Sequence, residues 1–220
     1  QGILKTSDFD RYTVGLNLNP SFLQDHLKIN ASAKYMHAKT RYADDQTVKN
    51  ALAMDPTKPV RSSDAAYKNF GGFYQWTQDG SVLNDPEWPL TKIQLATQNP
   101  IAMLDMKDDL GKSNAFVGNM ELDYKVHGFE DLRLHMNLGA DVSGGRQDTK
   151  ISPLSGTNTY YGYNGWEKIN KYNLSYNAYA QYIKEIDKNN HFDVMAGYEW
   201  QHFHREGQKH GAGTYPSTNK

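Results

Sequence analysis

The stretch RYTVGLNL, at residues 11–18, alternates apolar and polar side chains with a period of two. Its larger apolar side chains are Tyr12, Val14, Leu16 and Leu18. Successive side chains of a β-strand point to opposite faces of the sheet. This stretch therefore predicts a strand that presents one apolar face and one polar face.

Five further stretches alternate in the same way, and the six stretches form three pairs, each joined by a short turn. The predicted strand pairs are 11–19 with 27–39, 114–126 with 132–143, and 171–186 with 191–204. Much longer connections, residues 40–112 and 144–170, separate the pairs. Outer-membrane β-barrels share this asymmetry, because their periplasmic turns are short and their extracellular loops are long. The pattern predicts an all-β fold: an antiparallel up-and-down section of a transmembrane β-barrel, with six strands and long extracellular loops.

The alternation also predicts which side chains meet lipid and which line the lumen of the barrel. The side chains expected to face lipid are Leu16, Ile29, Leu122, Leu134, Leu174 and Val194. The side chains expected to face the lumen are Asn17, Asn30, Asp123, Arg133, Asn177 and Asp193. Each predicted strand contributes one residue to each set, so we expect the two faces to continue across the sheet.

A soluble β-sandwich is the alternative fold, because its strands alternate too. Two observations favour the barrel. Most of the predicted strands exceed ten residues, whereas ordinary strands have about five or six. The chain also contains 15 tyrosines, and tyrosine is enriched where a protein meets the two surfaces of a membrane.

The composition narrows the class of protein. No run approaches the roughly 18 apolar residues of a membrane-spanning helix, and the 38% hydrophobic content suits a barrel, in which half of each strand faces water. The formal net charge of −1 gives no broad basic field for nucleic acid. The chain has no cysteine, which excludes disulfides and thiolate chemistry.

The two ends of the chain indicate a fragment. The sequence begins QGI without an initiator methionine, has no signal peptide, and ends in the polar tail GTYPSTNK at residues 213–220. We expect the 220 residues to be a section of a longer protein.

Short motifs over nearly the whole chain resemble, in their order and spacing, the SusC-like family of TonB-dependent outer-membrane transporters. Three motifs lie in the first long connection: DPTKPV at 55–60, GGFYQW at 71–76 and NPIAML at 99–104. The flanking motifs are TSDFDRY at 6–12, LKIN at 27–30, GN at 118–119, LDY at 122–124, LRL at 132–134 and GAD at 139–141.

The resemblance implies a barrel of about 22 strands with a plugged lumen, located in the outer membrane of a Gram-negative bacterium and surrounded by its lipids. It further implies a TonB box, energy supplied by the TonB complex, a SusD-like surface lipoprotein as a lid, and import of large nutrients, either oligosaccharides or peptides. Residues 1–220 would then be part of the barrel wall, with the plug domain and the remaining strands outside this chain. A passive porin or a structural surface barrel is the rival function, since it would share the strand pattern, and a soluble ligand-binding β-sandwich is a further alternative.

No constellation of residues indicates an enzyme, a cofactor or a metal. His202 and His204 share a strand face, and His210 follows, but a metal site needs further ligands and supporting groups. Adjacent carboxylates such as Asp44–Asp45 and Asp108–Asp109 lack the alternating ligands and glycine turn of a calcium loop. No nucleophile elbow, phosphate loop or zinc-helix motif occurs. We expect no catalytic activity.

The aromatic residues of the two long connections are the candidate contacts for a substrate or a lid. They are Phe73, Tyr74, Trp76, Trp88, Tyr160, Tyr161, Tyr163 and Trp166. Flat rings with polar tips stack on sugars or on peptide side chains while their hydroxyl or indole groups orient the ligand. The alternative is that these rings form the small cores that hold long loops together.

Overall fold

In the computed structural model, six long strands form one antiparallel sheet, as the alternation predicts. The structure describes residues 3–80, 90–93, 95–156, 162–188 and 190–213. The long strands are β1 (Asp8–Leu18), β3 (Leu27–Arg41), β6 (Lys107–Lys125), β7 (Leu132–Ile151), β8 (Tyr163–Asp187) and β9 (Asn190–Ala212). Their order in the sheet is β1-β3-β6-β7-β8-β9, and the short strand β2 (Ser21–Phe22) pairs with β3. Each long strand therefore pairs with the next one along the chain, which confirms the predicted order.

The strands are longer than predicted at the end of the sheet that carries the long connections. β7 continues to Ile151, and β8 already begins at Tyr163, so the predicted loop 144–170 is wrong over most of its length. Strand β6 likewise begins at Lys107 and not at residue 114. The sequence GGRQDTKI at residues 144–151 loses the apolar alternation, yet backbone hydrogen bonds to both neighbouring strands continue. The alternation of apolar and polar side chains therefore ends before the hydrogen bonding between the strands does.

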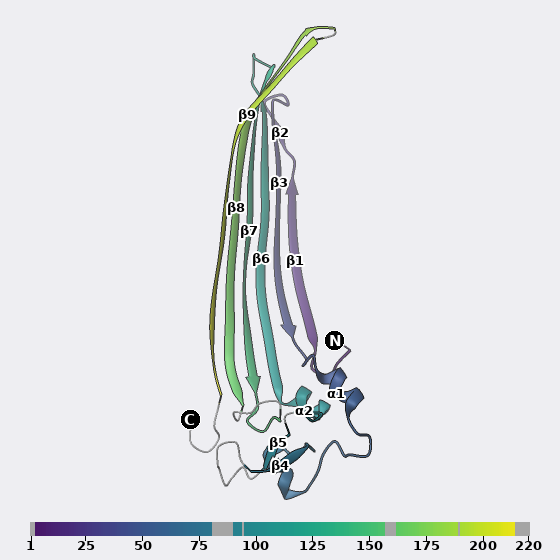
Figure 1. Cartoon of the computed structure of the whole chain (residues 1–220). Coiled ribbons are helices and arrows are strands. Elements are labelled where there is room, and N and C mark those ends of the chain that lie inside the picture. The colour runs from purple at the N-terminus through teal and green to yellow at the C-terminus, as the bar shows by residue number, and fades with distance from the viewer. Residues whose placement is uncertain (1–2, 81–89, 94, 157–161, 189, 214–220) are drawn as a thin grey trace.

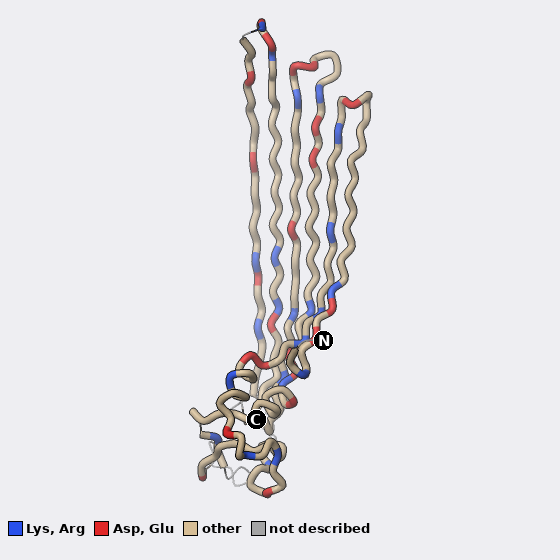
Figure 2. Tube along the Cα trace, turned by 90° about the vertical axis from the view of Figure 1, so that its right-hand side faces the viewer, with Lys and Arg blue, Asp and Glu red and all other residues tan. Residues whose placement is uncertain are grey.

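All short turns lie at one end of the sheet and all long connections at the other (Figure 1). The hairpin of β8 and β9 extends beyond the other short turns, and strand β1 begins and strand β9 ends at the loop end. Lys, Arg, Asp and Glu concentrate toward the two ends of the strands, with few charged positions between them (Figure 2). The middle of the sheet therefore carries few charges, as expected for the part of a barrel wall that crosses a membrane.

The strand register places the predicted lipid-facing residues on one face, which we call the outer face. Ile29 lies opposite Leu122, and Leu174 lies opposite Ala140 and His202. Directly opposed residues of antiparallel strands share a face. The predicted lumen-facing residues share the opposite, inner face, where Asp123 lies opposite His135.

The buried core lies in the loop assembly, the folded connection between β3 and β6. Its elements are α1 (Thr47–Ala53), the 3₁₀ helix η1 (Ala65–Phe70), β4 (Thr77–Asp79), β5 (Leu90–Lys92) and α2 (Pro100–Asp105). The buried hydrophobic residues of this assembly are Phe70, Phe73, Ala102, Met103 and Leu104. No helix within the described ranges is long and apolar enough to cross a membrane.

Candidate functional site

One buried asparagine organises the loop assembly. Asn99 is 1% exposed, and its Nδ2 donates hydrogen bonds to the carbonyl oxygens of Val60 (2.7 Å) and Tyr74 (3.1 Å). Its Oδ1 accepts from the backbone N–H groups of Ile101 (3.1 Å) and Ala102 (3.2 Å). This is the N-cap of α2, followed by Pro100 at the position where a missing N–H costs nothing. Asn99 therefore ties three segments of the connection together, which gives the NPIAML motif a structural role.

Three half-buried rings line up on the loop assembly, and we call them the aromatic strip: Tyr67, Tyr74 and Trp76. The ring centroids are 5.3 Å apart for Tyr67 and Tyr74 and 5.5 Å apart for Tyr74 and Trp76, the latter pair meeting edge to face. The ammonium of Lys58 lies 5.4 Å from the Trp76 ring centroid, within the range of a cation–π contact. The strip combines exposed ring surface with polar tips.

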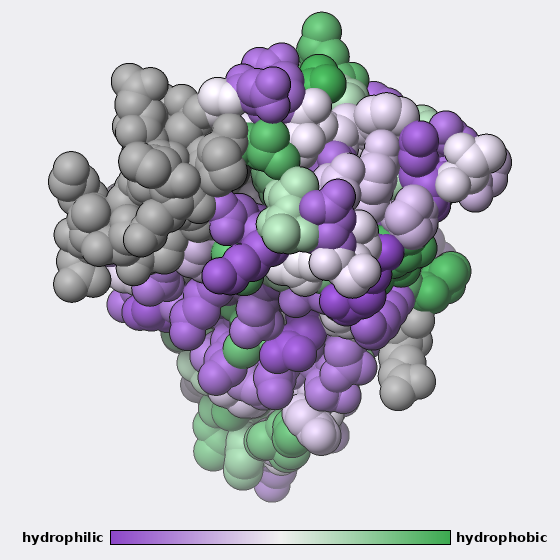
Figure 3. All heavy atoms as spheres, turned by 90° about the horizontal axis from the view of Figure 1, so that it is seen from below, coloured by the Kyte–Doolittle hydropathy of each residue, from purple (hydrophilic) through white to green (hydrophobic). Residues whose placement is uncertain are grey.

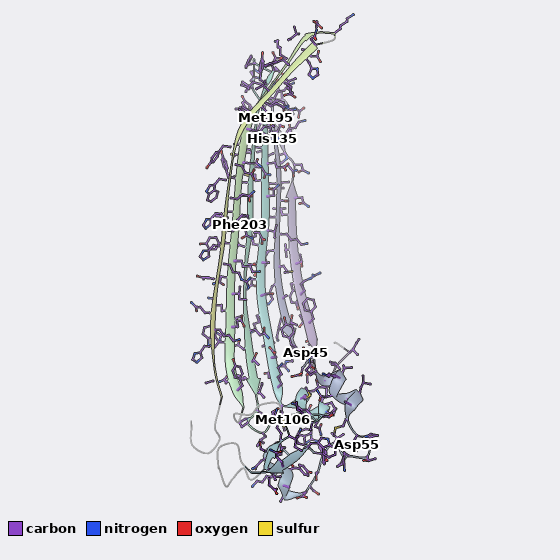
Figure 4. The ribbon with its side chains drawn as sticks, viewed as in Figure 1. Asp45, Asp55, Met106, His135, Met195 and Phe203 are labelled. Carbon is purple, nitrogen blue, oxygen red and sulfur yellow. The ribbon has the colours of Figure 1, made fainter. Side chains whose placement is uncertain are left out.

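The two phenols of the strip are partly shielded from solvent. The partial loss of solvation raises the pKa of the Tyr67 phenol and of the Tyr74 phenol, so both hydroxyls stay neutral and able to donate hydrogen bonds at neutral pH. Asp55 lies nearby at the outside of the loop assembly (Figure 4). Hydrogen bonds from the backbone N–H and hydroxyl of Thr57 lower the pKa of the Asp55 carboxyl.

The loop assembly also buries a lysine. Lys92 of β5 is 8% exposed, and the loss of solvation lowers the pKa of its ammonium group.

From the loop end the surface is largely hydrophilic, interrupted by small apolar patches (Figure 3). A ligand arriving from this end meets mostly polar groups.

The predicted aromatic contacts fall into different environments. Phe73 is 4% exposed, with the guanidinium carbon of Arg61 4.0 Å from its ring centroid, so Phe73 belongs to the loop core. Only Tyr74 and Trp76 of the predicted residues in the first connection present half-buried rings in the described part of the chain. The predicted contacts Trp88, Tyr160 and Tyr161 lie outside the described residues.

Tyr163 and Trp166 lie on β8 and not in a loop. Tyr163 lies on the inner face, against the paired glycines Gly165 and Gly211, where a Cβ on either glycine would collide with its ring. Trp166 lies on the outer face, with the Arg146 guanidinium carbon 4.9 Å from its ring centroid and the His210 ring centroid at 6.2 Å. The structure therefore separates these two residues from the aromatic strip and from each other.

Three contributors to the site, Tyr67, Lys58 and Asn99, were not among the residues predicted to contact a ligand. Tyr67 reaches the strip because η1 ends at Gly71, whose left-handed backbone (φ of 64°) turns the chain back toward Tyr74. Lys58 and Asn99 join it through contacts between segments far apart in the sequence. The glycine pair in GGFYQW was the available clue, since positive φ favours glycine.

The inner face carries a polar lining. The Arg133 guanidinium lies 3.3 Å from the Asp123 carboxylate, and the His135 imidazole lies 3.4 Å from it. The Gln181 side-chain amide donates to Asp193 at 3.0 Å. His135 and Met195 mark the short-turn end of this face in Figure 4, far from Met106, which lies where α2 joins the foot of the sheet.

The histidines predicted to be unsuited to metal lie on the outer face. His202 and His204 stack with each other and with Tyr172, with centroid separations of 6.5, 5.7 and 4.5 Å. Over the described ranges, no three His, Asp or Glu side chains come together in a way that could hold a metal ion.

Solved structures share the fold of this sheet. The RagAB peptide importer in its open-open state aligns over 96% of this chain and 22% of its own, with a TM-score of 0.62 at 17% identity. A second structure, of the RagAB peptide transporter, aligns over 96% of this chain with a TM-score of 0.60. At this identity the likeness concerns the fold alone. The antiparallel sheet therefore has the fold of a section of these larger chains.

Sequence comparison identifies the family. The TonB-dependent receptor SusC of Bacteroides thetaiotaomicron is 48% identical over 213 residues, which are 96% of this chain and 21% of that receptor. The TonB-dependent receptor P26 of Formosa agariphila is 26% identical over 91% of this chain and 18% of its own length. No protein-family model matches the chain. The chain belongs to the SusC-like family of TonB-dependent receptors, and it spans about a fifth of the length of these relatives.

Proposed function

We propose that this chain is part of the wall of a TonB-dependent importer that brings large nutrients, oligosaccharides or peptides, across the outer membrane of a Gram-negative bacterium. The observation that carries the proposal is the 48% identity to the SusC receptor over 96% of the chain. The missing part of the protein supplies the plug and the TonB box in this proposal. The chain has no catalytic role.

The orientation of the wall follows from its two unlike ends. Barrels keep short turns in the periplasm and long loops outside the cell, so the loop assembly is the extracellular end. The outer face then meets lipid, and the inner face, with Asp123, Arg133 and His135, lines the lumen.

The aromatic strip contacts the substrate or a SusD-like surface lipoprotein. Its rings offer flat apolar surface, while the neutral hydroxyls of Tyr67 and Tyr74 offer hydrogen bonds. Sugar faces and peptide side chains need this combination. Phe73 supports the strip from the core and does not contact the ligand.

A passive porin remains the competing function, because it would use the same wall and the same orientation. The two differ in their need for energy, since TonB-dependent uptake stops when the TonB complex is removed. We expect uptake by the full-length protein to depend on TonB. Uptake of the same nutrient at an unchanged rate in cells without TonB would support the porin.

The strip is tested by Trp76→Ala in the full-length protein. If Trp76 stacks on the ligand, the loss of about 1–2 kcal/mol of ring contact should raise the half-saturating nutrient concentration roughly 5- to 30-fold. Trp166→Ala is the matched control, because Trp166 lies on the outer face. Both variants should reach wild-type levels in the outer membrane.

Binding of the lipoprotein is measured on the same variants by co-purification. A loss of co-purification by Trp76→Ala, with uptake lost in parallel, would assign the strip to the lid rather than to the nutrient. Equal uptake and equal co-purification by wild type, Trp76→Ala and Trp166→Ala would contradict a binding role for the strip.

A further inference from the structure

Four basic residues from four neighbouring strands form one line across the outer face. The register places Lys39 of β3 opposite Lys112 of β6, Lys112 opposite Arg146 of β7, and Arg146 opposite Lys168 of β8. All four are exposed. We call them the basic row. Figure 2 shows basic positions on neighbouring strands close to the loop end.

The basic row is unfavourable to the sheet on its own. Side chains directly opposite one another have Cβ atoms about 5 Å apart, and like charges at that spacing destabilise the pairing. Lys112 lies between Lys39 and Arg146, and Arg146 lies between Lys112 and Lys168. An acidic residue in place of Lys112 would remove two of the repulsive pairs. Because all four positions are basic, we expect an external anion to stabilise the row.

The described residues neutralise the row only in part. Asp10 lies opposite Lys39 at one end of the row, and the Asp148 carboxylate lies 2.7 Å from the Arg146 guanidinium. Asp148 also interacts electrostatically with Lys112, and Glu206 with Lys168, but within the described ranges no carboxylate lies within 4 Å of the ammonium group of either lysine. Arg146, held by Asp148 and Trp166, is therefore a fixed cation between two lysines that lack such partners.

The depth of the row relative to the membrane indicates which kind of anion could neutralise it. On β7 the apolar side chains of the outer face end at Val142, and Arg146 follows four residues later. Four residues correspond to about 13 Å along a strand and about 10 Å of depth at the usual barrel tilt of about 40°. The head-group layer of a bilayer is about 5–8 Å thick on each side, and long basic side chains reach back toward it. The row therefore lies at the outer edge of the head groups.

We propose that the basic row binds the phosphate groups of a phosphorylated glycolipid of the outer leaflet, of the lipid A type. The inference rests on the membrane orientation given under the proposed function. A lipid is the occupant because the row lies on the face opposite the lumen lining, in line with the apolar residues that receive acyl chains. Its phosphates supply the anions that the row lacks, and its chains cover the apolar surface beside Val142 and Tyr172.

The test uses the full-length protein in detergent, titrated with lipid A and with the same lipid after removal of its phosphates. A basic residue near an anionic lipid surface is worth about fivefold in affinity. K112Q/K168Q should therefore weaken binding of the phosphorylated lipid about 25-fold and leave binding of the dephosphorylated lipid unchanged. The matched control is K34Q/K171Q, which removes two lysines from the inner face of the same sheet and should bind like wild type.

Thermal stability provides a readout that does not depend on binding. Without phosphorylated lipid, K112Q/K168Q should be at least as stable as wild type, because all three repulsive pairs of the row are removed. With phosphorylated lipid, wild type should gain more stability than the variant. This separates loss of the site from loss of folding.

Three outcomes would overturn the proposal. They are equal binding of both lipids by wild type, wild-type binding by K112Q/K168Q, and binding of inorganic phosphate to the row as tight as that of the lipid, which would make the row a general anion site. Uptake assays separate this inference from the proposed function. Normal TonB-dependent uptake without a preference for the phosphorylated lipid contradicts the basic row alone, and a preference without uptake contradicts the importer alone.

Discussion

The assignment of the outer face is tested most directly by Leu138→Arg. On β7 the apolar outer-face side chains run from Leu132 to Val142. These residues are ten positions apart, about 33 Å along the strand and about 25 Å of depth at a tilt of about 40°, which is the height of the apolar band of barrels. Leu138 lies one residue from the midpoint, so an arginine there would sit near the centre of the bilayer.

An arginine at this depth costs about 2–4 kcal/mol, or roughly 30- to 700-fold in the folding equilibrium. Leu134→Arg, about 8 Å from the midplane by the same arithmetic, should cost less, about 1–2 kcal/mol, because the penalty falls toward the interface. The control is Asn137→Arg. Asn137 is the neighbouring residue, lies on the inner face, and is directly opposite Glu121, so an arginine there gains an opposite charge across the strands.

The measurement is a urea titration of the full-length protein folded into lipid vesicles, with the amount in the outer membrane of cells as a second readout. We expect the destabilisation to decrease in the order Leu138→Arg, Leu134→Arg, Asn137→Arg. Should Asn137→Arg destabilise the protein as much as Leu138→Arg, the assignment of the two faces would be wrong.

The remaining predictions concern the chain as a fragment and the core of the loop assembly. Expressed alone, residues 1–220 should aggregate or require detergent, because the outward edges of β1 and β9 have no partner in the described sheet and unpaired edges are not tolerated in lipid; a monodisperse, folded, water-soluble monomer in size-exclusion chromatography would contradict the membrane fold. Asn99→Ala should destabilise the loop assembly by about 2–4 kcal/mol, since it removes a helix cap and two hydrogen bonds to backbone carbonyls; the expected result is faster protease cleavage between β3 and β6 with normal barrel assembly, and unchanged cleavage would refute the role of Asn99.

Local pattern was sufficient to predict the sheet. Residues such as Leu16, Ile29 and Leu122 repeat every second position, and each pair of strands is joined by a connection too short for any other pairing. The antiparallel direction within each pair and the division into two faces follow from those two facts, and the order of the pairs follows from the up-and-down topology of a barrel. The NPIAML and GGFYQW motifs likewise predicted the family.

The extent of the strands was not predictable in the same way. Beyond Val142 and before Tyr172, both faces of the sheet carry polar side chains, so the period of two disappears although the backbone ladder continues. A loop was therefore predicted where β7 and β8 run on, and Trp166 was placed with the loop aromatics. The aromatic strip also depends on tertiary contacts, since Tyr67 and Lys58 meet Trp76 only after the connection folds.

The basic row depends on the register alone. Lys39, Lys112, Arg146 and Lys168 are separated by 22 to 73 residues, and each taken singly is an unremarkable polar residue of a strand end. The sequence sets the number of basic residues, and the position of each one in its strand sets the face on which it lies. Only the hydrogen-bonded register of β3, β6, β7 and β8 decides that the four stand side by side, because a shift of two residues along any strand would keep the faces and break the row.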